Sequence, residues 1–195
     1  MKNTTRKIVL SSMLAALVCV ATMIIKIPSP LKGYINLGDC IVLLSGWVLS
    51  PVYGFLAAGI GSALADLLSG YATYVPATFI IKGVMAIIAY FGFTVLQKKV
   101  GNLASRIISG VASETVMILG YFIFEGFLYG FVPSAVNIPA NGVQGIVGLI
   151  LGIILVKIFE KSKIMQQLLN LLNICHSKKS AIQLDAEKLE RYAKT

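Results

Sequence analysis

Ionisable and amide side chains interrupt the apolar segments of this chain at a few positions only. They are Asp39, Asp66, Lys82, Glu125, Asn137, Asn141 and Gln144. A charged side chain in the middle of a bilayer costs on the order of 2.5 to 3.5 kcal/mol, so it persists where it is paired, hydrated or functional. Carboxylate, ammonium and amide groups gathered in one place could bind a polar solute, and carboxylates beside a lysine could also transfer protons.

Each charged residue near the middle of the chain also has a structural interpretation. Asp66 and Lys82 could neutralise one another as an ion pair, and Asp39 could be an ordinary cap of the helix that it begins. We favour structural roles for the two aspartates. Lys82 suits either role, because a lysine can also bind an anionic or hydroxyl-rich ligand.

Polar residues close to the last two apolar segments are better candidates for ligand contact. Asn141 and Gln144 lie about one turn apart at the start of a predicted helix, so they share one face, and Glu125 follows the preceding helix. Glu114 lies deeper in that preceding helix. We expect it to be a buried, hydrogen-bonded acid outside the polar group.

Aromatic residues crowd the three loops beside these polar positions. They could form the aromatic belt that is usual at a membrane interface, or walls that stack a heteroaromatic ligand. They are Tyr34, Tyr71, Tyr74, Phe127, Tyr129 and Phe131.

The composition predicts which elements position these residues. Of the 195 residues, 57% are hydrophobic and 13% are charged, which is too apolar for an ordinary soluble domain. A helix needs about 20 apolar residues to cross the bilayer core, so the chain before its polar tail holds at most about six crossings. We predict an all-α membrane protein with a six-transmembrane-helix bundle over residues 1–162 and a basic cytoplasmic tail over 163–195.

Proline and glycine clusters separate the predicted helices. We expect helices over residues 8–25, 39–49, 51–68, 77–96, 107–124 and 139–159, and a short amphipathic helix over 165–174. We expect loops over residues 28–38, 69–76, 97–106 and 126–138. Small residues four apart, such as Gly61 with Ala65 and Gly148 with Gly152, indicate close contacts between helices of the bundle.

Basic residues predict the orientation in the membrane, because they gather in cytoplasmic segments. If the N- and C-termini are cytoplasmic, the basic residues on the inside are Lys2, Arg6, Lys7, Lys98, Lys99, Arg106 and every basic residue from Lys157 onward. Lys26 and Lys32 then lie outside. The polar residues fall in the outward halves of the helices, where they would surround a pocket that opens outward.

Other classes of protein are disfavoured. The net charge of +9 is explained by the membrane topology and does not require nucleic-acid binding. The chain has three cysteines, none of them closely spaced, and one histidine. This indicates neither a disulfide framework nor a metal site. A phosphate-binding loop and a nucleophile elbow are lacking from the sequence. We predict no cofactor and no metal, and any energy for transport must come from another protein.

Residues 33–88 carry a specific family resemblance. Their sequence, GYINLGDCIVLLSGWVLSPVYGFLAAGIGSALADLLSGYATYVPATFIIKGVMAII, resembles the substrate-binding S components of energy-coupling factor (ECF) transporters, in the branch for riboflavin-, hydroxymethylpyrimidine- or pyridoxine-like substrates. The similarity extends over about residues 5–160. It implies a six-helix protein that associates with a transmembrane coupling subunit and two cytoplasmic ATPases and topples to release its ligand inside.

The resemblance also implies sites. The family docks through Ala-x-x-x-Ala on its first helix, matched here by Ser12 and Ala16, of which the serine is a departure. Its ligand is held by three outward loops and the outer parts of two helices. With the polar and aromatic residues above, this predicts a substrate site of Tyr34, Asn36, Tyr74, Lys82, Glu125, Tyr129, Asn137, Asn141 and Gln144.

The predicted function is capture of a small heteroaromatic vitamin or precursor for ATP-driven uptake across the plasma membrane, without catalysis by this chain. One alternative is a membrane-embedded enzyme that uses Asp66, Lys82 and Glu125 as acid and base groups. The other is a carrier that works without ATPases.

Overall fold

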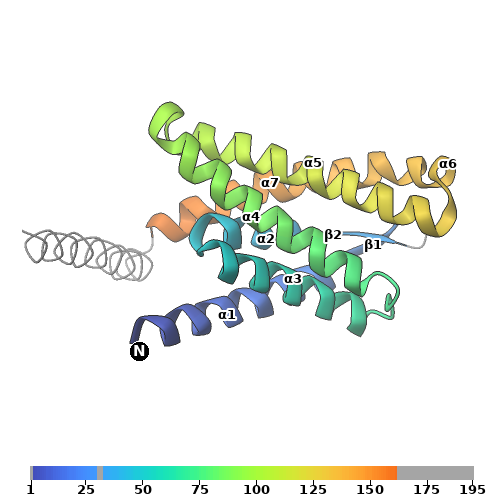
Figure 1. The fold of residues 1–195 in the computed structure, drawn as a ribbon, viewed down its shortest axis with the longest axis horizontal. Coiled ribbons are helices and arrows are strands. Elements are labelled where there is room, and N and C mark those ends of the chain that lie inside the picture. Colours follow the sequence, from blue (N-terminus) through green and yellow to red (C-terminus); the bar gives the residue numbers. More distant parts are fainter. Residues whose placement is uncertain (1, 30–32, 162–195) are drawn as a thin grey trace, which may run out of the picture.

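Long helices make up most of the chain, and a small β-hairpin lies at one end of them (Figure 1). The computed structural model describes residues 2–29 and 33–161. Its elements are α1 (Lys2–Ile24), β1 (Lys26–Pro28), β2 (Tyr34–Asn36), α2 (Gly38–Val48), α3 (Pro51–Leu68), α4 (Val75–Val100), α5 (Asn102–Tyr129), α6 (Phe131–Ser134), the 3-10 turn η1 (Ala135–Asn137) and α7 (Ile138–Lys161). The amphipathic helix predicted over 165–174 and the whole tail predicted over 163–195 lie outside the described residues.

Helices form at all six positions predicted over residues 8–159, although α1 begins at Lys2 and not at Ile8. Helices α4 and α5 are also longer than expected. They leave only Gly101 between them, so the loop predicted over 97–106 is wrong. Gly101 turns the chain by itself because it adopts φ +80°, a left-handed conformation that side chains disfavour. Lys98 and Lys99 therefore form the last turn of α4, and Arg106 is buried in α5.

The two other loops that differ from the prediction lie at the end of the bundle opposite Gly101. Residues within the expected loop over 28–38 form an antiparallel hairpin, in which Ile27 pairs with Ile35 and Pro28 with Tyr34. The expected loop over 126–138 is wrong as well, because α5 continues to Tyr129. After Gly130, which has φ +93°, α6 and η1 lead directly into α7.

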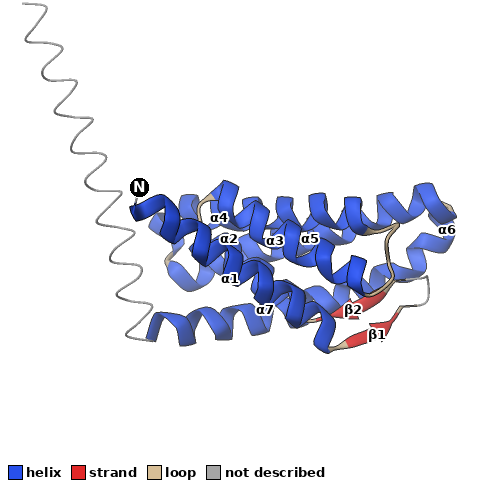
Figure 2. Ribbon diagram, turned by 90° about the horizontal axis from the view of Figure 1, so that it is seen from below, coloured by secondary structure: helices blue, strands red, loops and turns tan. Residues whose placement is uncertain are grey.

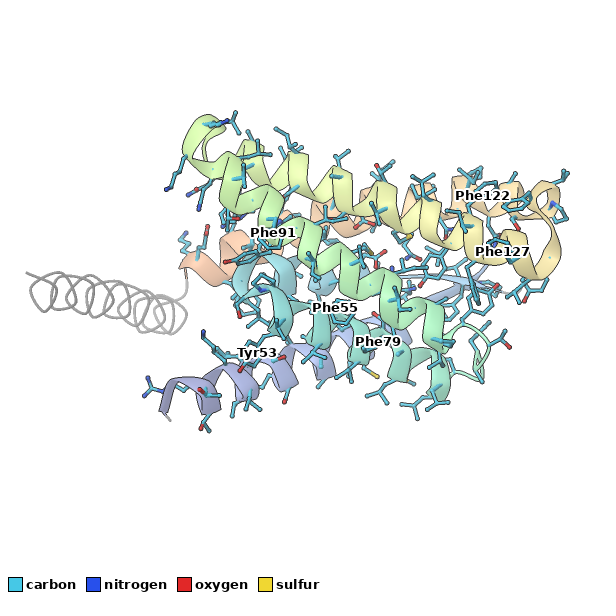
Figure 3. The ribbon with its side chains drawn as sticks, viewed as in Figure 1. Tyr53, Phe55, Phe79, Phe91, Phe122 and Phe127 are labelled. Atoms are coloured by element: carbon cyan, nitrogen blue, oxygen red, sulfur yellow. The ribbon has the colours of Figure 1, made fainter. Side chains whose placement is uncertain are left out.

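Helix α2 lies in the interior of the bundle. All its residues from Gly38 to Trp47 are buried, and it packs against α1, α3, α4 and α7. The fully buried core includes Leu43 and Leu44 of α2 and Met85 of α4. Beside this core, the rings of Phe55 and Phe79 join α3 to α4 edge to face, with centroids 5.3 Å apart (Figure 3).

Within residues 2–29 and 33–161, five helical segments are long and apolar enough to cross a membrane. They are Thr4–Ile24, Pro51–Leu68, Val75–Val100, Asn102–Tyr129 and Phe131–Lys161. Their outer faces expose large apolar side chains, including Ile80, Phe91, Ile123 and Ile150, as lipid contact requires. Helix α2, with 11 residues, is a shorter apolar helix that these segments enclose.

The two ends of the bundle differ in chemistry. The start of α1, the turn between α4 and α5 and the end of α7 lie at one end, and the hairpin and α6 lie at the other (Figures 1 and 2). Exposed Lys98, Lys99 and Lys161 belong to the first end. The second end carries the aromatic and polar residues described below.

Small residues allow close approach between helices inside the bundle, as predicted. Gly61 of α3 lies against the backbone of α1, and Gly148 and Gly152 of α7 lie against Asp39 and Cys40 of α2. A Cβ atom at Gly61 or Gly148 would collide with the neighbouring helix, and one at Gly152 would make a tight contact, 3.3 Å from the Cys40 carbonyl oxygen. The small residues thus set the distances between helices.

Gly46 tests this packing. A Cβ atom there would lie 2.6 Å from the Ala86 carbonyl oxygen and 2.7 Å from the Ala89 Cβ. We expect Gly46→Ala to lower the free energy of unfolding by about 1 to 3 kcal/mol, because α2 and α4 must separate. Thermal unfolding of the purified protein in detergent measures the change.

The matched control is Gly142→Ala on α7, where a Cβ atom meets nothing within 4 Å. It should leave the melting temperature unchanged or raise it slightly, because alanine favours a helix over glycine. Equal melting temperatures for the two variants would show that α2 and α4 are not in close contact.

Candidate functional site

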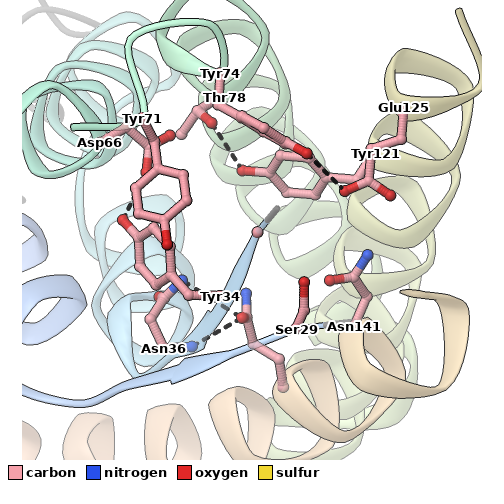
Figure 4. A pocket seen from close by; sticks show the side chains of 12 residues that line it. Ser29, Tyr34, Asn36, Asp66, Tyr71, Tyr74, Thr78, Tyr121, Glu125 and Asn141 are labelled. Atoms are coloured by element: carbon pink, nitrogen blue, oxygen red, sulfur yellow. Dashed lines mark hydrogen bonds between the residues drawn. The ribbon is translucent and has the colours of Figure 1, made fainter. Parts of the chain in front are cut away.

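A pocket lies at the hairpin end of the bundle, among residues from the hairpin, α3, α4, α5 and α7 (Figure 4). Its empty volume is about 410 Å³, including the part that is open to solvent. It is lined by Ser29, Gly33, Tyr34, Asn36, Asp66, Tyr71, Tyr74, Thr78, Tyr121, Glu125, Asn141 and Gln144.

Helix periodicity brings one side of the pocket together. Tyr121 and Glu125 are four residues apart on α5, and Asn141 and Gln144 are three apart on α7, so each pair shares a helix face. The Tyr121 hydroxyl lies 3.0 Å from that of Thr78 on α4. This hydrogen bond joins α5 to α4 at the pocket wall.

The hairpin and the end of α3 form the side of the pocket opposite α5 and α7. Tyr34 and Asn36 are two residues apart on β2, so both side chains point to the same face. The Tyr34 hydroxyl donates to Asp66 Oδ1 at 2.6 Å, and its ring lies 4.8 Å from that of Tyr71. Burial, and then the hydrogen bond to Asp66, raise the pKa of Tyr34, which therefore keeps its proton as a donor.

Hydrogen bonds from two neighbouring side chains position the Glu125 carboxylate. Asn137 Nδ2 donates to both carboxylate oxygens at 2.9 Å, and the Tyr74 hydroxyl lies 3.4 Å from Oε1. Burial, and then a hydrogen bond with Tyr129, raise the pKa of Tyr74. Asn137, Tyr74 and Tyr129 therefore orient the carboxylate at the pocket surface.

A buried polar network lies beneath the pocket. Lys82 of α4 forms an ion pair with Asp39 Oδ1 of α2, and the two side chains are 3% and 0% exposed. Gln144 Nε2 donates to Asp39 Oδ2 at 2.7 Å, and its Oε1 accepts from the Asn36 backbone N–H at 2.9 Å. One network thus connects α4, α2, α7 and the hairpin.

This network corrects two structural interpretations of the sequence. Asp39 is not a helix cap, because Leu37 occupies the N-cap position and no side chain caps the helix. Lys82 forms its ion pair with Asp39 and not with Asp66, which binds Tyr34. The physical reason is the interior position of α2, whose first turn meets both α4 and α7.

Glu114 also differs from the expectation. It is 5% exposed, and within the described part of the chain its carboxylate oxygens have no hydrogen-bond partner, so the predicted hydrogen-bonded acid is wrong. The residues of α7 that face Glu114 explain why it has no hydrogen bond there. Gly145 and Gly148 of α7 lie against Glu114 and have no side chain that could donate.

Six of the nine predicted substrate-site residues line the pocket: Tyr34, Asn36, Tyr74, Glu125, Asn141 and Gln144. Lys82 and Asn137 lie behind the lining, and Tyr129 lies beside Tyr74. Whether these nine residues bind a ligand stays a prediction.

Sequence reasoning did not assign Ser29, Gly33, Tyr71, Thr78 or Tyr121 to the site, and it favoured a structural role for Asp66. The spacing of four between Tyr121 and Glu125 was the available signal for Tyr121.

Apolar helices of spanning length around a polar pocket at one end define an integral membrane protein that can bind a small polar molecule. The chain belongs to the family of ECF-type riboflavin transporter S components, whose model matches residues 2–161. This confirms the resemblance carried by residues 33–88.

Two individual proteins are similar to this chain over most of their length. An uncharacterized protein in the gap 3′ region of Pyrococcus woesei is 34% identical over 136 residues, which cover 69% of this chain and 88% of that protein. The thiamine precursor transporter HmpT of Lactococcus lactis subsp. cremoris is 27% identical over 142 residues, covering 70% of this chain and 78% of HmpT.

The fold also has a counterpart among solved structures. The S component of a bacterial ECF transporter superposes with a TM-score of 0.61 at 24% identity, over 82% of this chain and 99% of the other. As a member of this family, the protein is a membrane substrate-binding subunit of the vitamin-uptake type. It is not an enzyme, so the enzyme alternative is wrong.

Lys82→Met tests the network beneath the pocket. It leaves the Asp39 carboxylate buried without its ion-pair partner, and loss of one partner of a buried pair typically costs about 3 to 5 kcal/mol. We expect a clear loss of thermal stability in detergent.

The double variant Asp39→Asn/Lys82→Met should recover much of that stability, because neither of these two positions then carries a charge without its partner. Exposed Lys98→Met is the control and should change little. If Lys82→Met and Lys98→Met melt alike, the ion pair does not contribute to stability.

Proposed function

We propose that the chain captures a small heteroaromatic vitamin or vitamin precursor from outside the cell and hands it to an ATP-driven coupling module. The observation that carries the proposal is the pocket at the hairpin end, where tyrosine rings, amides and carboxylates converge on one space in an apolar bundle. Ligand sites commonly combine flat apolar walls with a few placed polar groups.

The contacts proposed for the substrate follow from this geometry. Tyr34 and Tyr71 offer ring faces for stacking, and Glu125 offers carboxylate oxygens. Asn141 is half-buried, and its side-chain amide makes no hydrogen bond to another described residue, so both its donor and its acceptor are available. Lys82, Asn137 and Tyr129 belong to the proposed site as residues that hold the lining in place.

The proposed orientation has six crossings, cytoplasmic termini and the pocket facing outward. The exposed lysines at the end opposite the pocket support it, because basic residues gather on the cytoplasmic side. Helix α2 would be the sixth crossing. Its 11 residues rise only about 16 Å, so the hairpin before it would complete the path through the bilayer of the plasma membrane.

The proposed docking surface for the coupling module is a groove between α1 and α3. Exposed Ser12 and Ala16 lie in this groove, beside Leu56, Ile60 and Leu64 of α3. Small side chains there would let a helix of the transmembrane coupling subunit approach α1 closely. Two cytoplasmic ATPases would drive the assembled transporter.

Substitution of pocket residues tests the substrate site. We expect Glu125→Ala and Asn141→Ala each to weaken binding by about tenfold or more, because each removes hydrogen bonds in a partly desolvated site. Mass spectrometry of whatever copurifies with the wild-type protein identifies the ligand, and isothermal titration of that ligand measures the affinity.

The control is Asn102→Ala, an exposed position at the other end of α5. It should leave the affinity unchanged. If both pocket variants bind as tightly as this control, the pocket is not the substrate site.

Substitution in the groove tests the docking surface. Ala16→Trp should abolish most uptake into proteoliposomes that also contain the coupling module, while ligand binding by the isolated protein persists. The reason is that bulk in the groove blocks approach of a partner helix without reaching the pocket.

The matched control is Ala112→Trp, at an exposed position of α5 outside the groove. It should support normal uptake. Normal uptake by Ala16→Trp would contradict this docking surface, and uptake by the isolated chain would show that it is a carrier.

A further inference from the structure

Glu114 of α5 is a buried acid that reaches no hydrogen-bond donor among the described residues. It is 5% exposed, and neither of its carboxylate oxygens has a partner there. The three other acids that are buried in this part of the chain, Asp39, Asp66 and Glu125, each accept a hydrogen bond. Burial of an ionised carboxylate without such a bond is very costly in a medium of low dielectric. Glu114 therefore needs a partner that the described side chains do not supply.

Helix α7 offers no donor to this carboxyl group. A Cβ atom at Gly145 would lie 3.1 Å from Glu114 Oε2, and one at Gly148 would lie 3.4 Å from Oε1. The carboxyl group thus lies against two glycines, which have no side chain. Backbone N–H groups inside a helix already donate to carbonyl groups of the same helix. They are not free to bind Glu114.

The charged neighbours of Glu114 belong to the network beneath the pocket. Among the described residues, Asp39 of α2 and Lys82 of α4 interact with it electrostatically, and Cys40 of α2 is a further titratable neighbour. The Lys82 ammonium is already held in its ion pair with Asp39. One ammonium group thus serves two carboxyl groups, and ionisation of both would leave a net negative charge in the bundle interior.

A proton fits this position better than a metal ion. A metal ion would need several oxygen ligands at once. Within residues 2–29 and 33–161, no group of three or more His, Cys, Asp or Glu side chains is placed to hold one. A proton needs a single carboxylate oxygen, and its charge neutralises the group completely.

We infer that Glu114 is a proton-binding site in the interior of the bundle: it holds a proton in the folded protein, and loss of that proton sets a second carboxylate charge beside the Lys82–Asp39 pair. This pair and Gln144 connect α2, α4 and α7 beneath the pocket. The charge state of Glu114 therefore acts on the stability of the pocket floor. The inference goes beyond the proposed function, because the site needs no ligand and no partner protein.

The dependence of stability on pH tests the inference. A glutamate of an unfolded chain ionises above about pH 4.3, so folding takes up one proton at Glu114 and stability falls as the pH rises. We expect the melting temperature of the ligand-free full chain in detergent to fall between about pH 5.5 and about pH 8.5. It should fall more steeply than that of Glu114→Gln, by about 3 to 5 °C per pH unit, because glutamine does not titrate.

The matched control is Glu160→Gln, at the other end of α7, where the side chain binds Arg106. This variant also replaces one glutamate by glutamine, but far from Glu114. It should keep the pH dependence of the wild type, whatever its effect on the melting temperature itself.

Infrared spectroscopy gives a second readout that does not depend on unfolding. The folded wild type at neutral pH should show the carbonyl band of a protonated carboxyl group that is lost in Glu114→Gln. Glu114→Asp, which keeps a carboxyl group, should shift this band, and it serves as the second variant if the glutamine variant does not fold.

The outcomes decide between the two kinds of cation. Equal pH dependence of the wild type and Glu114→Gln, or a carboxyl band that neither variant changes, would overturn the inference. A melting temperature that rises when sodium chloride replaces choline chloride, in the wild type and not in Glu114→Gln, would show a sodium ion there and overturn the proton. All these measurements are made without ligand, so the proposed function stands or falls separately.

Discussion

The Lys82 ammonium and the Asp39 carboxylate meet in the interior of an apolar bundle, and the rest of the site depends on their pairing. Neither charge could remain there alone, because burial of an unpaired charge in a medium of low dielectric is very costly. Their pairing holds the first turn of α2 against α4. Gln144 extends the contact to α7 and, through the Asn36 backbone, to the hairpin. The pocket floor therefore forms only when these elements are assembled.

The polar groups near the pocket form two sets: a buried set beneath the pocket and a surface set that lines it. Those beneath the pocket bind one another, as Lys82, Asp39 and Gln144 do. The groups of the surface set can make further hydrogen bonds. Glu125 can accept more hydrogen bonds than Asn137 donates, and Asn141 is open to the pocket. The buried set holds the Lys82 ammonium in its ion pair with Asp39, beneath the pocket floor.

The close helix contacts and the proposed ligand pocket lie in different parts of the molecule. Glycines let α3 approach α1 and let α7 approach α2. One consequence is that the Glu114 carboxylate faces glycines of α7 and has no donor among the described residues. The groove between α1 and α3 lies on the side of the bundle, whereas the pocket lies at the hairpin end. A partner could thus occupy the groove while a ligand occupies the pocket.

The sequence by itself determined the class of protein, most helix boundaries, the close helix contacts and the end of the bundle that carries the polar residues. These follow from local signals: apolar length, proline at the start of α3, spacing of small residues and the family pattern of residues 33–88. It also identified six of the residues that line the pocket.

Only the tertiary structure decided the partner of Lys82, the place of Tyr121 in the pocket wall, and the absence of a donor for Glu114 within the described residues. Lys82 and Asp39 are 43 residues apart, and Gln144 and Asp39 are 105 apart. Which residues meet over such separations depends on the rotation and depth of each packed helix, and helix periodicity along one segment carries no information on either.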